Sequence, residues 1–138
     1  MDKYDFTVFF SVEDAESETL FRFMRERFSV SPSFVRRKGE YISQALGLLA
    51  DRDMWVIKEQ YPNAEDINEV IDGFIQKYSP ILENIEELKG KFTIKLRLSV
   101  VSLVGQMLFV LSSDVQKKLA QIGLPLELSV FSYGGVTE

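Results

Sequence analysis

The chain has 138 residues, 46% of them hydrophobic, a length and composition typical of one globular domain with a buried core. It contains no Cys and no His, which excludes disulfides, thiol nucleophiles, Cys-based metal sites and a Ser–His catalytic pair. The formal net charge of −5 argues against nucleic acid as the main ligand, because nucleic-acid binding needs a dominant positive field. We therefore expect neither a metal nor a cofactor.

The N-terminal part of the chain predicts a strand followed by a helix. Residues 4–12 alternate as a strand does, and residues 13–28 carry apolar residues at the helical period after a cap at Asp14 or Ser17. The first apolar run is short and acids follow it at once, so it is neither a signal peptide nor a membrane span, and we expect a soluble, cytoplasmic protein. The residues expected in the core are Phe6, Val8, Phe10 and Val12 in the strand and Leu20, Phe21, Met24 and Phe28 in the helix.

The stretch SPSFVRRKGE at residues 31–40 is the most basic passage in an acidic chain. Its proline, serines and glycine favour a turn, with a short strand around Phe34 and Val35. Residues 41–53 fit a helix by their apolar spacing but contain Gly47 and lack a clear cap, so the pattern leaves their structure open.

The central part of the chain predicts a second strand and a long helix. Residues 54–61 form the strand, which a Pro-Asn turn ends. Asn63 is expected to cap a helix over residues 64–89, in which apolar residues keep the helical period throughout. Pro80 lacks a backbone N–H, so it should kink this helix or restart it with Ser79 as a new cap.

The C-terminal part predicts a strand over residues 91–103 with the clearest alternation in the chain. Apolar side chains at every second position face the core, while Thr93, Lys95, Arg97 and Ser99 point away from it. The further elements expected are a strand over 106–112, a helix over 112–123 and a strand over 124–133.

These elements predict a single α+β domain over residues 1–138, frayed from about residue 134. Strand–helix–strand units folded onto one mainly antiparallel sheet form a two-layer sandwich. In this arrangement the helices pack on one face of the sheet, with ferredoxin-like character.

Acidic residues gather on one side of the expected long helix, and aromatic residues bracket the second strand. The acids can bind a basic partner or form a solvated face that suits the helix N-terminus. No metal site is expected, because spacing along one helix does not converge on a point. The aromatic pair can line a ligand or belong to the core. The candidate partner-binding residues are Glu65, Asp66, Glu69, Asp72, Trp55 and Tyr61.

Basic residues outside the helices suggest a second kind of site, for an anion. Adjacent side chains on an extended segment point to opposite faces, so at most two of the three consecutive cations at residues 36–38 converge. The alternatives are a solvated turn for this triplet and ordinary solvent exposure for the sheet face. The candidate anion-binding residues are Arg36, Arg37, Lys38, Lys95 and Arg97.

In order and spacing the segments resemble the bacterial family catalogued as domain of unknown function 4279. The resemblance rests on SPSFVRRKGE, on a strand opening with Trp before a long helix with an acidic start, on TIKLRLSV and on the closing LSSDVQKKLAQIGLPLELSVFSY, and it spans Phe6 to Tyr133. The chain departs from the family in lacking a glycine in RFSVSP and a glycine-rich basic loop between Gly39 and Trp55. The resemblance implies a fold but no reaction, because the family has no established activity.

No G-x-S-x-G stretch or phosphate-binding loop is present, so we expect a protein without enzymatic activity. Small acidic bacterial domains of this kind often serve as immunity proteins. The leading expectation is a binding protein of the immunity type that neutralises a toxin, with a basic toxin domain as its partner and neither nucleic acid nor membrane. The alternative is a module that senses a small molecule or nucleotide through its anionic group.

Overall fold

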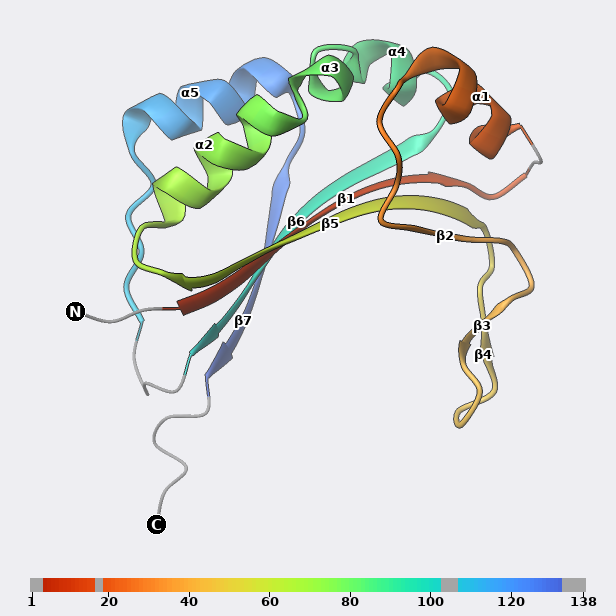
Figure 1. The fold of residues 1–138 in the computed structure, drawn as a ribbon, viewed down its shortest axis with the longest axis horizontal. Helices are drawn as coiled ribbons and strands as arrows, with labels where there is room; N and C mark the ends of the chain where they lie inside the picture. The colour runs from red at the N-terminus through yellow and green to blue at the C-terminus, as the bar shows by residue number, and fades with distance from the viewer. Residues whose placement is uncertain (1–3, 17–18, 103–106, 133–138) are drawn as a thin grey trace.

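A five-stranded sheet in the order β2-β5-β1-β6-β7 carries all the helices on one face in the computed structural model, which describes residues 4–16, 19–102 and 107–132 (Figure 1). β1 is antiparallel to β5 and to β6, β2 is antiparallel to β5, and β6 is parallel to β7. The expected α+β fold with a mainly antiparallel sheet is confirmed. The strands are β1 (Tyr4–Asp14), β2 (Phe34–Arg36), β5 (Asp53–Ala64), β6 (Thr93–Ser102) and β7 (Leu126–Ser132).

The connections explain the order of the strands. β5 and β6 lie on either side of β1 and are joined through three helices, which makes a split strand–helix–strand unit of the ferredoxin-like kind. β6 and β7 are joined through one helix as adjacent parallel strands. The helices are α1 (Leu20–Arg27), α2 (Ile67–Lys77), α3 (Ser79–Leu82), α4 (Ile85–Lys89) and α5 (Ser113–Ile122).

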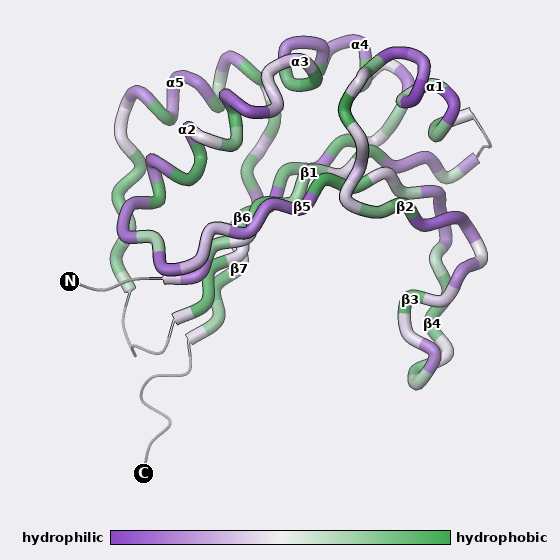
Figure 2. Tube along the Cα trace, viewed as in Figure 1, coloured by the Kyte–Doolittle hydropathy of each residue, from purple (hydrophilic) through white to green (hydrophobic). Residues whose placement is uncertain are grey.

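The core lies between the sheet and the helices. The alternating apolar residues of β1 and β6 point into it, as Phe10 and Leu98 do with 1% and 0% exposure. From the helices, Met24 and Phe74 meet them, and hydrophobic residues recur along both layers in Figure 2. Each such side chain contributes about 1.5–3 kcal/mol by leaving water, so the helices bind the sheet through this one face.

Residues 41–53, which the sequence left open, contain a small hairpin and no helix. β3 (Tyr41–Ser43) pairs with β4 (Leu48–Leu49), and the hairpin projects from the sheet on the side away from the helices (Figure 1). Gly47 adopts a φ of 65° in the turn, a conformation that glycine reaches without strain. The apolar spacing suggested a helix, but the large apolar side chains of the segment are exposed, Leu46 at 77%, so their burial does not stabilise a helix.

The start of α1 corrects the expected helix over residues 13–28. β1 continues to Asp14, because Glu13 pairs with Met54 of β5 and Thr93 of β6. Asp14 is therefore part of the strand and does not cap the helix, and the other expected cap, Ser17, lies outside the described residues. The observed N-cap is Thr19, which makes no side-chain capping bond.

The expected helix over residues 64–89 is divided into three. β5 runs on through Asn63, whose N–H donates to Asp5, so Asp66 takes the expected place of Asn63 as the cap of α2. The restart at Pro80 is confirmed by α3, but Ser79 is the first residue of this helix and not its cap, because the N-cap is Tyr78, which makes no side-chain capping bond. A second interruption precedes α4, where the side-chain amide of Asn84 donates to the carbonyl of Pro80. This local bond offers the backbone an alternative to the helix.

The predicted strand over residues 106–112 is wrong where the structure describes it, because residues 107–112 pair with no strand. Phe109 packs edge-on against Tyr4 and Phe6, while Leu108 and Val110 are exposed. The side chains therefore alternate between buried and exposed positions, although the backbone of this segment is not hydrogen-bonded to a neighbouring strand. The helix that follows is confirmed as α5, and the expected frayed tail lies outside the described residues. None of the described helices has the length and apolarity required to cross a membrane.

Candidate functional site on the uncovered sheet face

The face of the sheet opposite the helices is covered by no described helix or strand (Figure 1). Phe9 of β1 pairs with Arg97 of β6 and with Lys58 of β5, so these three side chains lie on this same face. Val56 lies two residues before Lys58 in β5, so strand alternation places it on this face as well. The side chains of Lys95 and Arg97 are 46% and 53% exposed. The polar face expected for the strand over residues 91–103 is therefore open to solvent.

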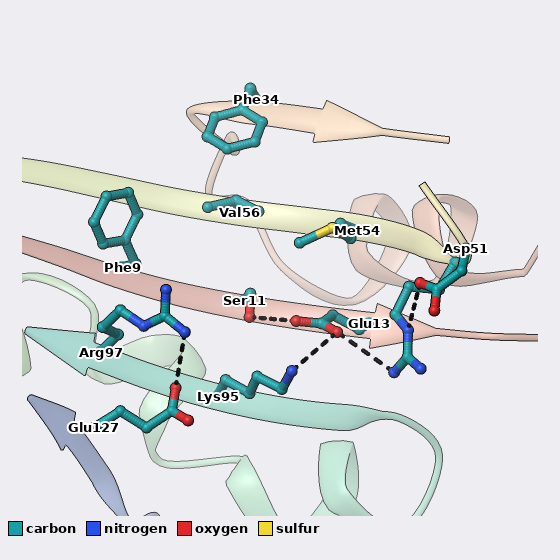
Figure 3. Close-up of a pocket in the computed structure, with 11 residues that line it drawn as sticks. Phe9, Ser11, Glu13, Phe34, Asp51, Met54, Val56, Lys95, Arg97 and Glu127 are labelled. Carbon is teal, nitrogen blue, oxygen red and sulfur yellow. Dashed lines mark hydrogen bonds and ion pairs between the residues drawn. The ribbon is translucent and has the colours of Figure 1, made fainter. Parts of the chain in front are cut away.

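This face contains a hollow of about 390 Å³ (Figure 3). One part is apolar and is formed by Phe9, Phe34, Met54 and Val56. Val56 is only 2% exposed although it points away from the helices, so its neighbours on this face already shield it. The other part is polar and is formed by Ser11, Glu13, Asp51, Arg52, Lys95, Arg97 and Glu127.

Glu13 is the buried charge at the polar end, with 4% exposure. The hydroxyl of Ser11 donates to its Oε2 at 3.0 Å, and its Oε1 lies 3.5 Å from Arg52 Nη1 and 3.6 Å from Lys95 Nζ (Figure 3). A carboxylate withdrawn from water in this way requires paired charges and hydrogen bonds. Glu13 thereby holds two cations, one from β6 and one from the turn before β5, at the same end of the hollow.

The hollow is electrically balanced in a protein that is acidic overall. Its lining has three carboxylates and three cations, against a net charge of −5 for the chain. Arg97 Nη2 lies 3.5 Å from Glu127 Oε1 in an exposed pair, and Arg52 also contacts Asp51 at 3.2 Å. Exposed pairs of this kind are weak, at about 0–1 kcal/mol, so a ligand can exchange partners with them. The hollow suits a group that is partly apolar and partly charged.

The candidate partner-binding residues fall in three places. Tyr61, Glu65, Asp66 and Glu69 line one surface hollow of about 340 Å³ at the start of α2. Asp72 stands apart from them, paired with Lys118, and this hydrogen bond raises the pKa of Lys118. No group of three or more acidic side chains arranged to hold a metal is found among the described residues.

Trp55 is buried, which corrects its expected place among the partner-binding residues. It points to the helical side of the sheet and is 3% exposed within the hydrophobic core. Its position opposite Val12 in the register of β1 and β5 puts it on the core face. It therefore presents almost no surface to a protein partner.

The candidate anion-binding residues are divided between the two faces. Arg36 lies over the ring of Phe34 at 5.6 Å on the uncovered face, which it shares with Lys95 and Arg97. Arg37 lies over Phe21 of α1 at 5.0 Å on the helical side. No small anion can contact this whole set.

Lys38 lies beyond the end of β2. Its Nζ donates to the carbonyl of Ala15 at 3.4 Å, and its backbone N–H donates to Asp53 at 2.8 Å. Arg36 and Arg37 thus lie on opposite faces, as the expected alternation requires, and Lys38 contacts a third set of residues.

Sequence reasoning missed Glu13, Arg52 and the exposed hairpin as parts of a site. The alternation of β1, continued past Val12, places Glu13 on the same face as Phe9 and Ser11. That signal was available in the sequence, but a helix was expected to begin at this residue. Arg52 had no such signal, because it lies in the turn between β4 and β5.

The family described as "Domain of unknown function (DUF4279)" matches residues 4–133, and the chain belongs to it. No curated protein and no solved structure gives a significant match.

Proposed function

We propose that this member of the DUF4279 family is a non-enzymatic, cytoplasmic binding protein of the immunity type, which neutralises a toxin by holding it on the uncovered sheet face and the β3–β4 hairpin. The observation that carries the proposal is the exposed apolar surface of the hairpin beside the open hollow. Apolar patches rimmed by polar side chains are typical of protein–protein interfaces.

The hairpin presents large apolar side chains to solvent on the same side as the uncovered face. Hydrophobic residues run along it in Figure 2, and Leu46 at its tip is 77% exposed. The hairpin and the sheet face meet at Asp51 and Arg52, which line the hollow. A convex partner can therefore touch both at once. The apolar side chains concerned are Tyr41, Ile42, Leu46, Leu48 and Leu49.

The choice of a toxin as the partner has weaker, associational support. The sequence has no His and no Cys, and its net charge of −5 suits a small protein that meets a basic partner. Glu65, Asp66 and Glu69, together with Tyr61, offer a second, acidic contact surface for a basic toxin domain. That surface lies at the start of α2, away from the hollow of the uncovered face.

The test is to search the neighbouring genes for one that encodes a toxin-like protein and to measure its binding to this protein by isothermal titration calorimetry. The hairpin variant Leu48→Asp/Leu49→Asp and the sheet variant Arg97→Glu should each weaken binding about tenfold or more, as loss of a central contact does. Glu65→Lys/Glu69→Lys reports on the acidic surface. Lys117→Glu, an exposed change on α5, is the matched control and should bind normally.

Absence of binding to the toxin, or unchanged binding by both the hairpin and the sheet variants, would contradict the proposal. If only the acidic variant loses binding, the partner occupies the start of α2 and the proposed surface is wrong.

A second candidate function is the sensing of a small molecule or nucleotide on the uncovered face. The observation in its favour is that Lys95 and Arg97, both about half exposed, border an apolar floor in the hollow. A screen of nucleotides and phosphorylated metabolites by thermal shift separates the two functions. A ligand that raises the melting temperature of the wild type but not of Arg97→Ala would favour sensing.

A further inference from the structure

A second hollow, of about 450 Å³, lies between α1, the segment after it and β2. It opens on the helical side of the sheet, where Val35 and Trp55 face α1. Its floor is apolar, and Trp55 at this floor is only 3% exposed. The main apolar residues that line it are Phe21, Phe28, Pro32, Val35 and Trp55.

The polar side chains of this hollow are two guanidinium groups and two hydroxyl groups, all of which can donate hydrogen bonds. They are Arg25, Arg37, Ser29 and Ser31, and no carboxylate is among the lining residues. The hollow on the uncovered face, in contrast, includes three carboxylates. Glu40 is close in sequence, but its carboxylate accepts from the backbone N–H of Arg37 and does not line the hollow.

Neither guanidinium forms an ion pair or a side-chain hydrogen bond within the described parts of the chain. Arg37 is held by its contact with the ring of Phe21 at 5.0 Å, which leaves its N–H groups available. Arg25 follows Phe21 by one helical turn, so the same face of α1 presents both the ring and the second arginine. Two free guanidinium groups in a chain of net charge −5 form a concentrated positive region.

Guanidinium groups bind oxyanions through paired, parallel hydrogen bonds, and serine hydroxyls can add further donors. An apolar floor next to such donors is the usual composition of a small-molecule site. The basic stretch identified in the sequence thus supplies one arginine to an acid-free hollow and another to the opposite face.

We propose that this hollow binds a small molecule that carries a carboxylate or phosphate group beside an apolar or aromatic part. Arg25 and Arg37 bind the oxyanion, and the apolar part lies against Val35 and Trp55. The site is on the opposite side of the sheet from the surface proposed for the protein partner, so the two proposals succeed or fail independently.

Trp55 is the one tryptophan of the chain and lies at the floor, so its fluorescence reports directly on this site. The probes are benzoate, phenyl phosphate and inorganic phosphate, each titrated into the full chain. Benzoate or phenyl phosphate should change the fluorescence saturably, and the comparison between them shows which oxyanion is preferred. Inorganic phosphate should bind more weakly, because it has no apolar part.

Arg37→Gln and Arg25→Gln should each weaken binding of the better probe about tenfold or more, since each removes hydrogen bonds to a charged group. Arg36→Gln is the matched control: it removes the neighbouring cation, which lies on the other face, and should bind the probe as the wild type does. Both arginines of the hollow are exposed, and circular dichroism verifies that each variant is folded. Equal affinity of the wild type and both hollow variants, an equal loss in Arg36→Gln, or no saturable change with any probe would overturn the proposal.

Discussion

Arg36 and Arg37 are adjacent in the sequence and lie on opposite sides of the sheet, Arg36 over Phe34 at 5.6 Å and Arg37 over Phe21 at 5.0 Å. Arg36 is the last residue of β2 and Arg37 follows it directly, where the alternation of the strand still directs the next side chain to the other face. Each guanidinium rests on an aromatic ring that belongs to its own face. One basic stretch therefore contributes to two surfaces with different chemistry, the open sheet face and the hollow under α1.

The buried carboxylate of Glu13 should contribute measurably to stability. Glu13→Gln removes the negative charge that pairs with both Arg52 and Lys95. We expect the free energy of unfolding to fall by about 1–2 kcal/mol. This value is at the low end for a hydrogen bond to a charged group, because both cations remain partly solvated. Urea denaturation measures this change. Glu127→Gln, which breaks the exposed pair with Arg97 on the same face, is the control and should change stability by less than about 0.5 kcal/mol. Equal losses in the two variants would contradict a special role for Glu13.

Phe10 and Phe9 test the two faces of β1 directly. Phe10 is 1% exposed and points into the core, so Phe10→Ala should cost about 3–5 kcal/mol through lost burial and the cavity left behind. Phe9 is partly exposed on the open face, and Phe9→Ala should cost clearly less, about 1 kcal/mol. Both values follow from chemical denaturation. Comparable costs at the two positions would mean that something covers the open face.

Replacing two of the glycines by alanine should change the stability of the protein in opposite directions. Gly123 ends α5 with a φ of 81°, so Gly123→Ala should destabilise the protein by about 1 kcal/mol. Gly73 lies inside α2 with a φ outside the left-handed range and nothing within 4 Å of an added Cβ, so Gly73→Ala should stabilise it by about 0.5–1 kcal/mol. Thermal unfolding of the two variants and the wild type measures whether each substitution raises or lowers the stability. A stabilising Gly123→Ala would be incompatible with this helix end.

Stability should decrease as the pH falls below about 4.5, in part because of Glu59. The hydrogen bonds from Lys77 and Tyr78 lower the pKa of Glu59 below its ordinary 4.5, so the folded protein releases this proton more readily than the unfolded chain. The resulting stabilisation is present above pH 4.5 and is lost as the pH falls through the lowered folded value. Tyr78→Phe removes one of these bonds and should raise the pKa of Glu59 toward 4.5, as followed by NMR titration. An unchanged titration in Tyr78→Phe would show that this bond does not act on Glu59.

The sequence was sufficient where a structural property is local. Alternation with a period of two assigned the faces of residues 6–12 and 93–100, and the helical period located the apolar stripes of the helices, because each depends only on backbone geometry. The absence of a hydrogen on the nitrogen of Pro80 likewise predicted the start of α3 without any tertiary contact. Membership of the family was also visible in the order of its segments.

Tertiary structure decided the features that depend on contacts between residues far apart in the sequence, such as where a strand ends and which charges meet. Glu13 stays in a strand because Met54 and Thr93 pair with it, and the local alternation alone did not show that the strand continues past Val12. The same pairing brings together positions 13, 52 and 95, and the docking of α1 on the sheet places Arg25 and Arg37 in the lining of one hollow. Residues 41–49 form a projecting hairpin whose large apolar side chains are exposed, so burial does not stabilise the helix that the spacing of residues 41–53 allows. The amino-acid pattern alone thus determined a two-layer α+β domain, whereas long-range strand pairing and helix docking determined which charges meet.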